Sequence, residues 1–121
     1  MIQAPLLDML RFEQIAAGAS WVGEYGSVSA PAERAFLASI SPYNQLKADV
    51  KYPEPQIITT TKDDRVGPVH ARKFAARMEE FKKPFLYEEI IEGGHDTGAD
   101  LKEKAKSYAW EYTYLMRKLV D

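Results

Sequence analysis

At 121 residues the chain is long enough for one domain, and an apolar fraction of 45% is ordinary for a globular protein. Acids and bases are interspersed and leave a net charge of −2, which argues against nucleic acid or a membrane surface as a partner. The absence of cysteine excludes disulfides and thiolate chemistry. The two histidines, His70 and His95, lack the spacing of metal ligands, so we expect neither a metal nor a cofactor.

The first half of the chain predicts short helices and loops. Met1 to Ala4 are mostly apolar but too few to form a strand alone. Apolar residues then recur near a helical period and predict a short helix over 6–16. A glycine-punctuated loop over 18–26 carries Trp21 and Tyr25. A proline near the first helical position predicts a helix over 31–40, which Ser41-Pro42-Tyr43 ends.

The second half predicts a strand–helix–strand unit and a long terminal helix. The β-branched run over 56–61 predicts a strand buried on both faces, as in a parallel sheet. A helix over 68–81, with His70 on its surface, and a strand over 85–91 follow. The helix over 99–119 has one apolar face, made by Leu101, Ala105, Tyr108, Ala109, Tyr112, Leu115, Met116 and Leu119. These elements indicate an α/β fold with a short parallel sheet of two or three strands and flanking helices.

Two residues that suit catalysis follow the two predicted strands. Asp63 comes directly after the first strand, and His95 comes after the second within a glycine-rich loop. Carboxyl ends of neighbouring parallel strands meet at one edge, so these side chains can meet there. A carboxylate followed by a histidine is the order of the supporting pair of a Ser-His-Asp triad in α/β-hydrolases. Each residue alone is more typical of a turn, a helix cap or a solvated histidine.

The nucleophile of such a triad should lie upstream, yet the chain contains no Gly-x-Ser-x-Gly motif. Ser20, Ser27 and Ser29 lie in loops without a strand-to-helix elbow. The sequence therefore predicts two parts of a catalytic centre without its serine.

Five blocks of sequence, in order and spacing, closely resemble the carboxyl-terminal part of the prolyl oligopeptidase family over nearly the whole chain. They are Pro5-Leu-Leu-Asp-Met-Leu-Arg-Phe12, Gly18-Ala-Ser-Trp-Val-Gly-Glu-Tyr-Gly26, Ser41-Pro-Tyr-Asn44, Asp63-Asp-Arg-Val-Gly-Pro-Val-His70 and Gly94-His95. Members of this family are serine peptidases whose α/β-hydrolase domain is capped by a β-propeller. One departure is the histidine loop, which reads Gly94-His-Asp-Thr-Gly98 rather than Gly-His-Gly.

The resemblance implies a role for six residues. Asp63 would be the triad acid and His95 the general base. Arg65 would bind the substrate carbonyl beside the proline, which suits a rigid, permanently charged fork. Trp21 would stack on the proline ring, and Tyr25 and Val66 would complete the apolar pocket.

The resemblance also implies that residues 1–121 form one partial catalytic domain, without the nucleophile-bearing half and without the propeller. We therefore expect a fragment of a peptidase that cleaves after proline, inactive by itself. The alternatives are a non-catalytic module that binds proline-containing peptides, or an esterase that uses Ser20. An unpaired strand edge at Met1 to Ala4 further predicts a homo-oligomer.

Overall fold

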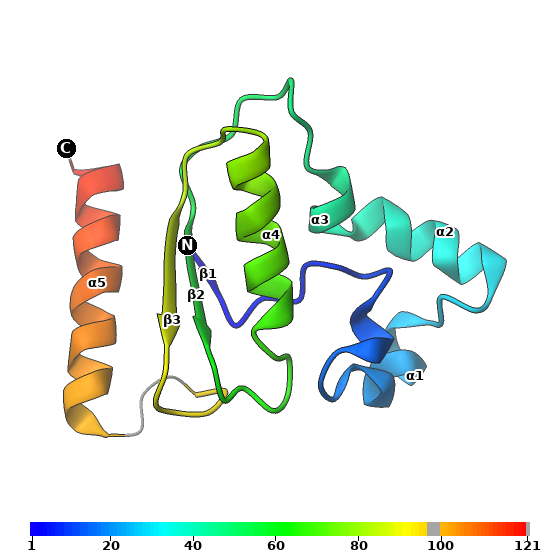
Figure 1. The fold of residues 1–121 in the computed structure, drawn as a ribbon, viewed down its shortest axis with the longest axis horizontal. Helices are drawn as coiled ribbons and strands as arrows, with labels where there is room; N and C mark the ends of the chain where they lie inside the picture. Colours follow the sequence, from blue (N-terminus) through cyan, green and yellow to red (C-terminus); the bar gives the residue numbers. More distant parts are fainter. Residues whose placement is uncertain (97–99, 121) are drawn as a thin grey trace.

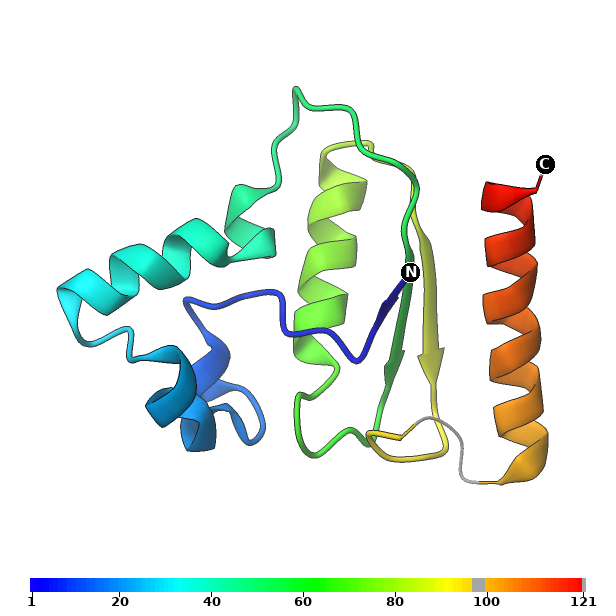
Figure 2. The same ribbon diagram turned by 180° about the vertical axis from the view of Figure 1, so that it is seen from behind.

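The structure is a computed structural model that describes residues 1–96 and 100–120. A three-stranded sheet separates two long helices, α4 (Val69–Glu80) on one face and α5 (Leu101–Leu119) on the other (Figure 1). A group of shorter helices lies beyond α4, away from α5 (Figure 2). The expected α/β architecture with a short parallel sheet is confirmed.

The sheet has the strand order β1-β2-β3, and both pairings are parallel. β2 (Gln56–Thr60) lies in the middle and is buried along its whole length, as its β-branched sequence predicts. β3 (Leu86–Ile90) pairs with all of β2, whereas β1 (Ile2–Gln3) pairs through two residues and forms the other edge. The carboxyl ends of β2 and β3 therefore lie side by side at the same end of the sheet.

The smaller helices form a second layer of packing with its own core. They are η1 (Phe12–Gln14), η2 (Gly18–Trp21), α1 (Val22–Tyr25), α2 (Pro31–Ile40) and α3 (Pro42–Gln45). Phe12, Leu37 and Met9 are its buried centre, separate from the cluster between α4 and the sheet. This layer carries the expected helix over 31–40.

The prediction of a helix over 6–16 is wrong, because only η1 within that range is helical. Hydrogen bonds to distant side chains hold the start of this segment in a non-helical path. The N–H groups of Leu7 and Asp8 donate to Nδ1 of His70, and that of Met9 donates to Oγ of Ser41. Tertiary contacts of this kind override a local helical pattern.

The segment 18–26, expected to be a loop, is mostly helical, because η2 and α1 occupy most of it. Gly18 permits the tight approach between η2 and η1: a Cβ atom at this position would lie 1.7 Å from the carbonyl oxygen of Phe12. A Cβ atom on Gly23, in α1, would meet nothing within 4 Å.

We therefore expect Gly18→Ala to lower the free energy of unfolding by about 2 kcal/mol, because the backbone must move apart. Gly23→Ala is the matched control and should be neutral or stabilising, since alanine favours a helix. Urea unfolding of both variants measures the difference. Equal stabilities would contradict the packing described for η1 and η2.

The terminal helix shows the expected periodicity, but its apolar face is exposed. Leu101, Tyr108, Tyr112 and Leu119 are 85%, 56%, 64% and 78% exposed. Asp100 caps the helix by accepting from the N–H of Glu103. The expected start at residue 99 lies outside the described residues. Within the described part of the chain, no helix is both long and apolar enough to cross a membrane.

Candidate functional site

The turn after β2 holds Asp63 in a fixed orientation. The Asp63 side chain is almost fully buried, and its Oδ1 accepts from the backbone N–H groups of Arg65 and Val66 at 2.9 and 3.0 Å. A short acidic side chain can close a turn in this way by accepting from the backbone two or three residues on. The same turn places Arg65 and Val66 immediately beside the carboxylate.

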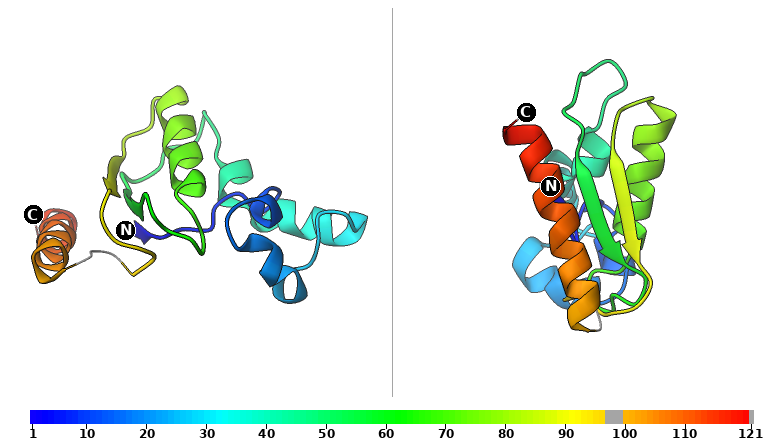
Figure 3. Two further views of the ribbon diagram at one scale, coloured as in Figure 1. Left: turned by 60° about the horizontal axis from the view of Figure 1, so that its bottom comes forward. Right: turned by 90° about the vertical axis from the view of Figure 1, so that its left-hand side faces the viewer.

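The loop after β3 brings His95 to the same edge of the sheet. Oγ1 of Thr60, the last residue of β2, donates to the carbonyl oxygen of Gly94 at 2.8 Å. Gly93 has φ of 116°, a conformation that a side chain would strain. Figure 3 shows the loop crossing the ends of β2 and β3. The hydrogen bond and the glycine together turn the imidazole back over the sheet.

Asp63 and His95 are in hydrogen-bond contact. Nδ1 of His95 lies 3.0 Å from both carboxylate oxygens of Asp63. Burial raises the pKa of Asp63, but the hydrogen bonds from His95, Arg65 and Val66 outweigh it and hold that pKa below its usual value. An ionised Asp63 accepts the Nδ1–H of a neutral His95, which leaves Nε2 free to act as a base.

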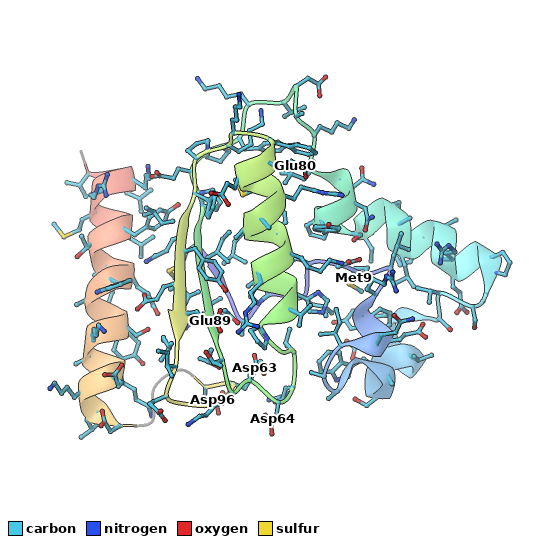
Figure 4. All side chains as sticks on the ribbon, viewed as in Figure 1. Met9, Asp63, Asp64, Glu80, Glu89 and Asp96 are labelled. Carbon is cyan, nitrogen blue, oxygen red and sulfur yellow. The ribbon has the colours of Figure 1, made fainter. Side chains whose placement is uncertain are left out.

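The neighbouring acid, Asp64, has a different environment. Asp64 is exposed, whereas Asp63 is buried. Figure 4 shows both at the strand ends, with Asp64 farther from the body of the sheet. Asp64 therefore offers a natural control for experiments on Asp63.

A polar hollow opens beside His95. It is about 480 Å³ in volume, and its walls come from the end of β1, the histidine loop and the first half of α5. The lining residues are Gln3, Ala4, His95, Asp96, Lys104 and Tyr108. A reacting group that contacts the imidazole can approach from this side.

The four residues expected to bind substrate line a second, smaller hollow. Trp21, Tyr25, Arg65 and Val66 surround a space of about 270 Å³. Leu6 and Glu24 also line it, and sequence reasoning missed both. Leu6 and Glu24 each lie within one of the five sequence blocks that resemble the family, so those blocks could have indicated them.

The serines considered as substitutes have other partners. Ser20 donates through Oγ to the carbonyl of Ala17 at 2.6 Å, and the hydroxyls of Ser27 and Ser29 lie 2.8 Å apart. Across residues 1–96 and 100–120, no hydrogen bond joins a serine hydroxyl to His95. The geometry gives Ser20 no support as a nucleophile.

His70 was expected on the surface of its helix, and this expectation is wrong. Its side chain is buried, with Nδ1 accepting from the N–H groups of Leu7 and Asp8. Burial lowers its pKa to about 4; nearby Asp8 acts in the opposite direction and Lys73 in the same direction. His70 is a structural residue that holds the segment leading to η1 against α4.

Asp63 and His95 lie at the carboxyl ends of parallel strands. α/β-Hydrolases have their catalytic residues at this position. The chain belongs to the prolyl oligopeptidase family, whose model matches residues 1–121.

Two curated relatives illustrate the similarity. An uncharacterized peptidase, y4nA, from Sinorhizobium fredii is 60% identical over 121 residues, which are the whole of this chain and 17% of the relative. A prolyl endopeptidase from Elizabethkingia miricola is 36% identical over 102 residues, covering 81% of this chain and 14% of the relative. The chain therefore spans about a sixth of the length of these relatives.

Solved structures of such peptidases share the fold. A post-proline cleaving enzyme from Rickettsia typhi matches with a TM-score of 0.84 and 33% identity, over 93% of this chain and 16% of that one. A structure from a study of two prolyl endopeptidases matches with a TM-score of 0.87 and 35% identity, over 95% of this chain and 17% of that one. The sheet and helices described above are thus those of part of an α/β-hydrolase domain.

Proposed function

We propose that this chain supplies the acid and the base of a serine peptidase that cleaves peptides after proline. The observation that carries the proposal is the contact between His95 Nδ1 and the Asp63 carboxylate, 3.0 Å long and fixed from behind by two backbone N–H groups. As an expectation from the family, residues 1–121 form one partial catalytic domain, and the serine comes from polypeptide outside it.

The chemistry follows from the two environments. His95 Nε2 takes the proton of a serine hydroxyl as the oxygen attacks the peptide carbonyl, and later gives it to the leaving amine. Asp63 stays ionised, orients the ring and stabilises the imidazolium that forms in between. Without a nucleophile no acyl-enzyme forms, so the 121-residue chain alone should be inactive.

The hollow beside Arg65 suits a proline side chain. Its volume of about 270 Å³ is small, its walls include the flat indole of Trp21 and the ring of Tyr25, and Val66 adds an apolar surface. The guanidinium of Arg65, which is exposed, can donate to a peptide carbonyl at the rim. Because Arg65 and Val66 follow Asp63 by two and three residues, a proline bound here would place its carbonyl near the acid–imidazole pair.

The experiment joins this chain to the missing part of such an enzyme. In a chimera, the 121 residues replace the aligned segment of the Sinorhizobium relative. We expect the chimera, but not the isolated chain, to hydrolyse a chromogenic peptide with proline before the scissile bond. Turnover by the isolated chain that His95→Ala abolishes would contradict the expected inactivity. A folded chimera whose turnover is unchanged by His95→Ala would refute the assignment of the base.

A further inference from the structure

A third hollow, largely apolar, lies between the second half of α5 and the beginnings of β2 and β3. It is about 430 Å³ in volume, within the range of about 300–1,000 Å³ that is typical of small-molecule sites. Leu86, Trp110 and Tyr114 contribute to its walls. Neither Asp63 nor His95 lines it, since both follow the opposite ends of these strands. The hollow is therefore separate from the acid–imidazole pair.

Two polar side chains in the wall of this hollow have oxygen atoms that lack a donor. Gln56 is in register with Leu86, and Glu88 is two residues further along β3, so all three side chains point to the α5 face of the sheet. Gln56 is only 4% exposed. Its Oε1 and the Oε2 of Glu88 are buried, and neither accepts a hydrogen bond from any described residue. Buried acceptors normally have a partner, so both atoms call for a donor.

The surroundings of Glu88 favour a positively charged donor. Burial raises the pKa of the Glu88 carboxyl and Lys106 lowers it, while Glu103 and Glu111 raise it further. The Nζ of Lys106 lies over the ring of Trp110, 5.7 Å from its centre. Among the ion pairs between described residues, none includes Glu88. A cation in the hollow would stabilise the ionised carboxylate.

Groups already near the hollow leave this role open. Arg117 lines the hollow, but it is exposed and interacts with the carboxylate of Glu54. A water molecule can donate to both buried oxygens. Water does not, however, cover the apolar wall, where Trp110 is 44% and Leu86 is 36% exposed. A molecule that has both an apolar body and a cationic donor meets both requirements.

We propose that this hollow binds a molecule that carries a primary ammonium group on an aromatic body. An ammonium has three N–H donors, which suits the oxygens of Glu88 and Gln56. The aromatic body lies against Trp110 and Leu86, where removal of apolar surface from water favours binding. The site takes no part in the proposed peptidase chemistry, and the inference does not depend on that function.

The test titrates the 121-residue chain with phenethylamine, whose amine is protonated at neutral pH. 2-Phenylethanol has the same body without the charge, and 3-phenylpropionate carries the opposite charge. The chain has two tryptophans, so Trp21→Phe leaves Trp110 as the fluorescent reporter, and calorimetry checks the affinities independently. We expect phenethylamine to bind at least about tenfold more tightly than 2-phenylethanol, because only a charged donor pairs with Glu88. We expect no binding of 3-phenylpropionate.

Two variants separate loss of the site from loss of the fold. Glu88→Gln keeps the shape but removes the charge, and should weaken phenethylamine binding by about tenfold. Gln56→Leu removes a buried acceptor at similar volume, so it should weaken binding while urea unfolding shows equal or greater stability. Glu80→Gln, an exposed acid at the end of α4 and outside the hollow, is the matched control and should bind as the parent does.

Each result decides the proposal in one direction. Equal affinities for phenethylamine and 2-phenylethanol would overturn the ammonium preference, and no binding of phenethylamine to the folded chain would overturn the site. Unchanged affinity in both Glu88→Gln and Gln56→Leu would place the ligand elsewhere and would also overturn it. The tripeptide amide Phe-Gly-Gly-NH₂ carries the same group at a peptide amino terminus. Its binding would support a peptide as the natural source, and binding of phenethylamine alone would support a free amine.

Discussion

Asp63→Asn in the joined chimera should lower kcat by about 10⁴-fold while leaving the fold intact. The reason lies in how Asp63 is held. Its Oδ1 accepts from the N–H groups of Arg65 and Val66, and an asparagine keeps its oxygen there. The amide NH₂ then faces His95 and donates to Nδ1, so the proton of the imidazole moves to Nε2. A histidine with its proton on Nε2 cannot accept the proton of a serine.

Asp64→Asn provides the matched comparison, because it removes an adjacent negative charge that is exposed to solvent. Steady-state turnover of a proline-containing substrate by both variants measures the difference. We expect Asp64→Asn to stay close to the parent. Comparable losses in the two variants would mean that general charge near the strand ends, rather than the orientation of His95, controls the rate.

The stability of the isolated chain should fall by about 3 kcal/mol as the pH drops from about 6.5 to about 4 because of His70 alone. Burial lowers the pKa of His70 in the folded state to about 4, from an ordinary value of 6.5. The unfolded chain therefore binds more protons in this interval, so stability is complete above it and is lost as the pH falls through it. Protonation of Nδ1 would also break the hydrogen bonds from Leu7 and Asp8.

Urea unfolding at several pH values measures this slope, with His70→Asn as the comparison. The asparagine oxygen can accept in place of Nδ1 and does not titrate, so the variant should lose most of the slope between about pH 4 and 6.5. Asp63 acts in a lower range: its pKa is below 3.8, so its contribution is lost only at more acid pH. A parent and a variant with the same slope would show that His70 is not buried as described.

Local patterns in the sequence predicted the sheet and the long helices well. The β-branched run of β2 and the amphipathic α4 each express one dominant influence, burial of apolar side chains, and the helical period of α5 was enough to predict a helix there. The order of Asp63 and His95 after two consecutive strands also placed them at one edge, because parallel strands end together. Family blocks, and not periodicity, brought Trp21, Tyr25, Arg65 and Val66 together as pocket residues.

The errors have a common physical origin in contacts between distant residues. His70 lies more than sixty positions from Leu7 and Asp8, yet its ring accepts from their N–H groups and holds this segment in a non-helical path. The local sequence pattern of residues 6–16 does not indicate that the His70 ring accepts these hydrogen bonds. In the same way, the apolar period of α5 predicts a buried stripe, whereas most of its large side chains are more than half exposed. The exposure of this stripe became visible only once the helix was placed against the sheet.

The tautomer of His95 in the isolated chain tests the central claim most directly, because it reports on the acid–imidazole pair without any partner. Long-range ¹H–¹⁵N NMR at about pH 8, where an ordinary histidine is neutral, identifies which ring nitrogen carries the proton. We expect the proton on Nδ1 in the parent chain and on Nε2 in Asp63→Asn. A proton on Nε2 in the parent, or the same tautomer in both proteins, would contradict the account.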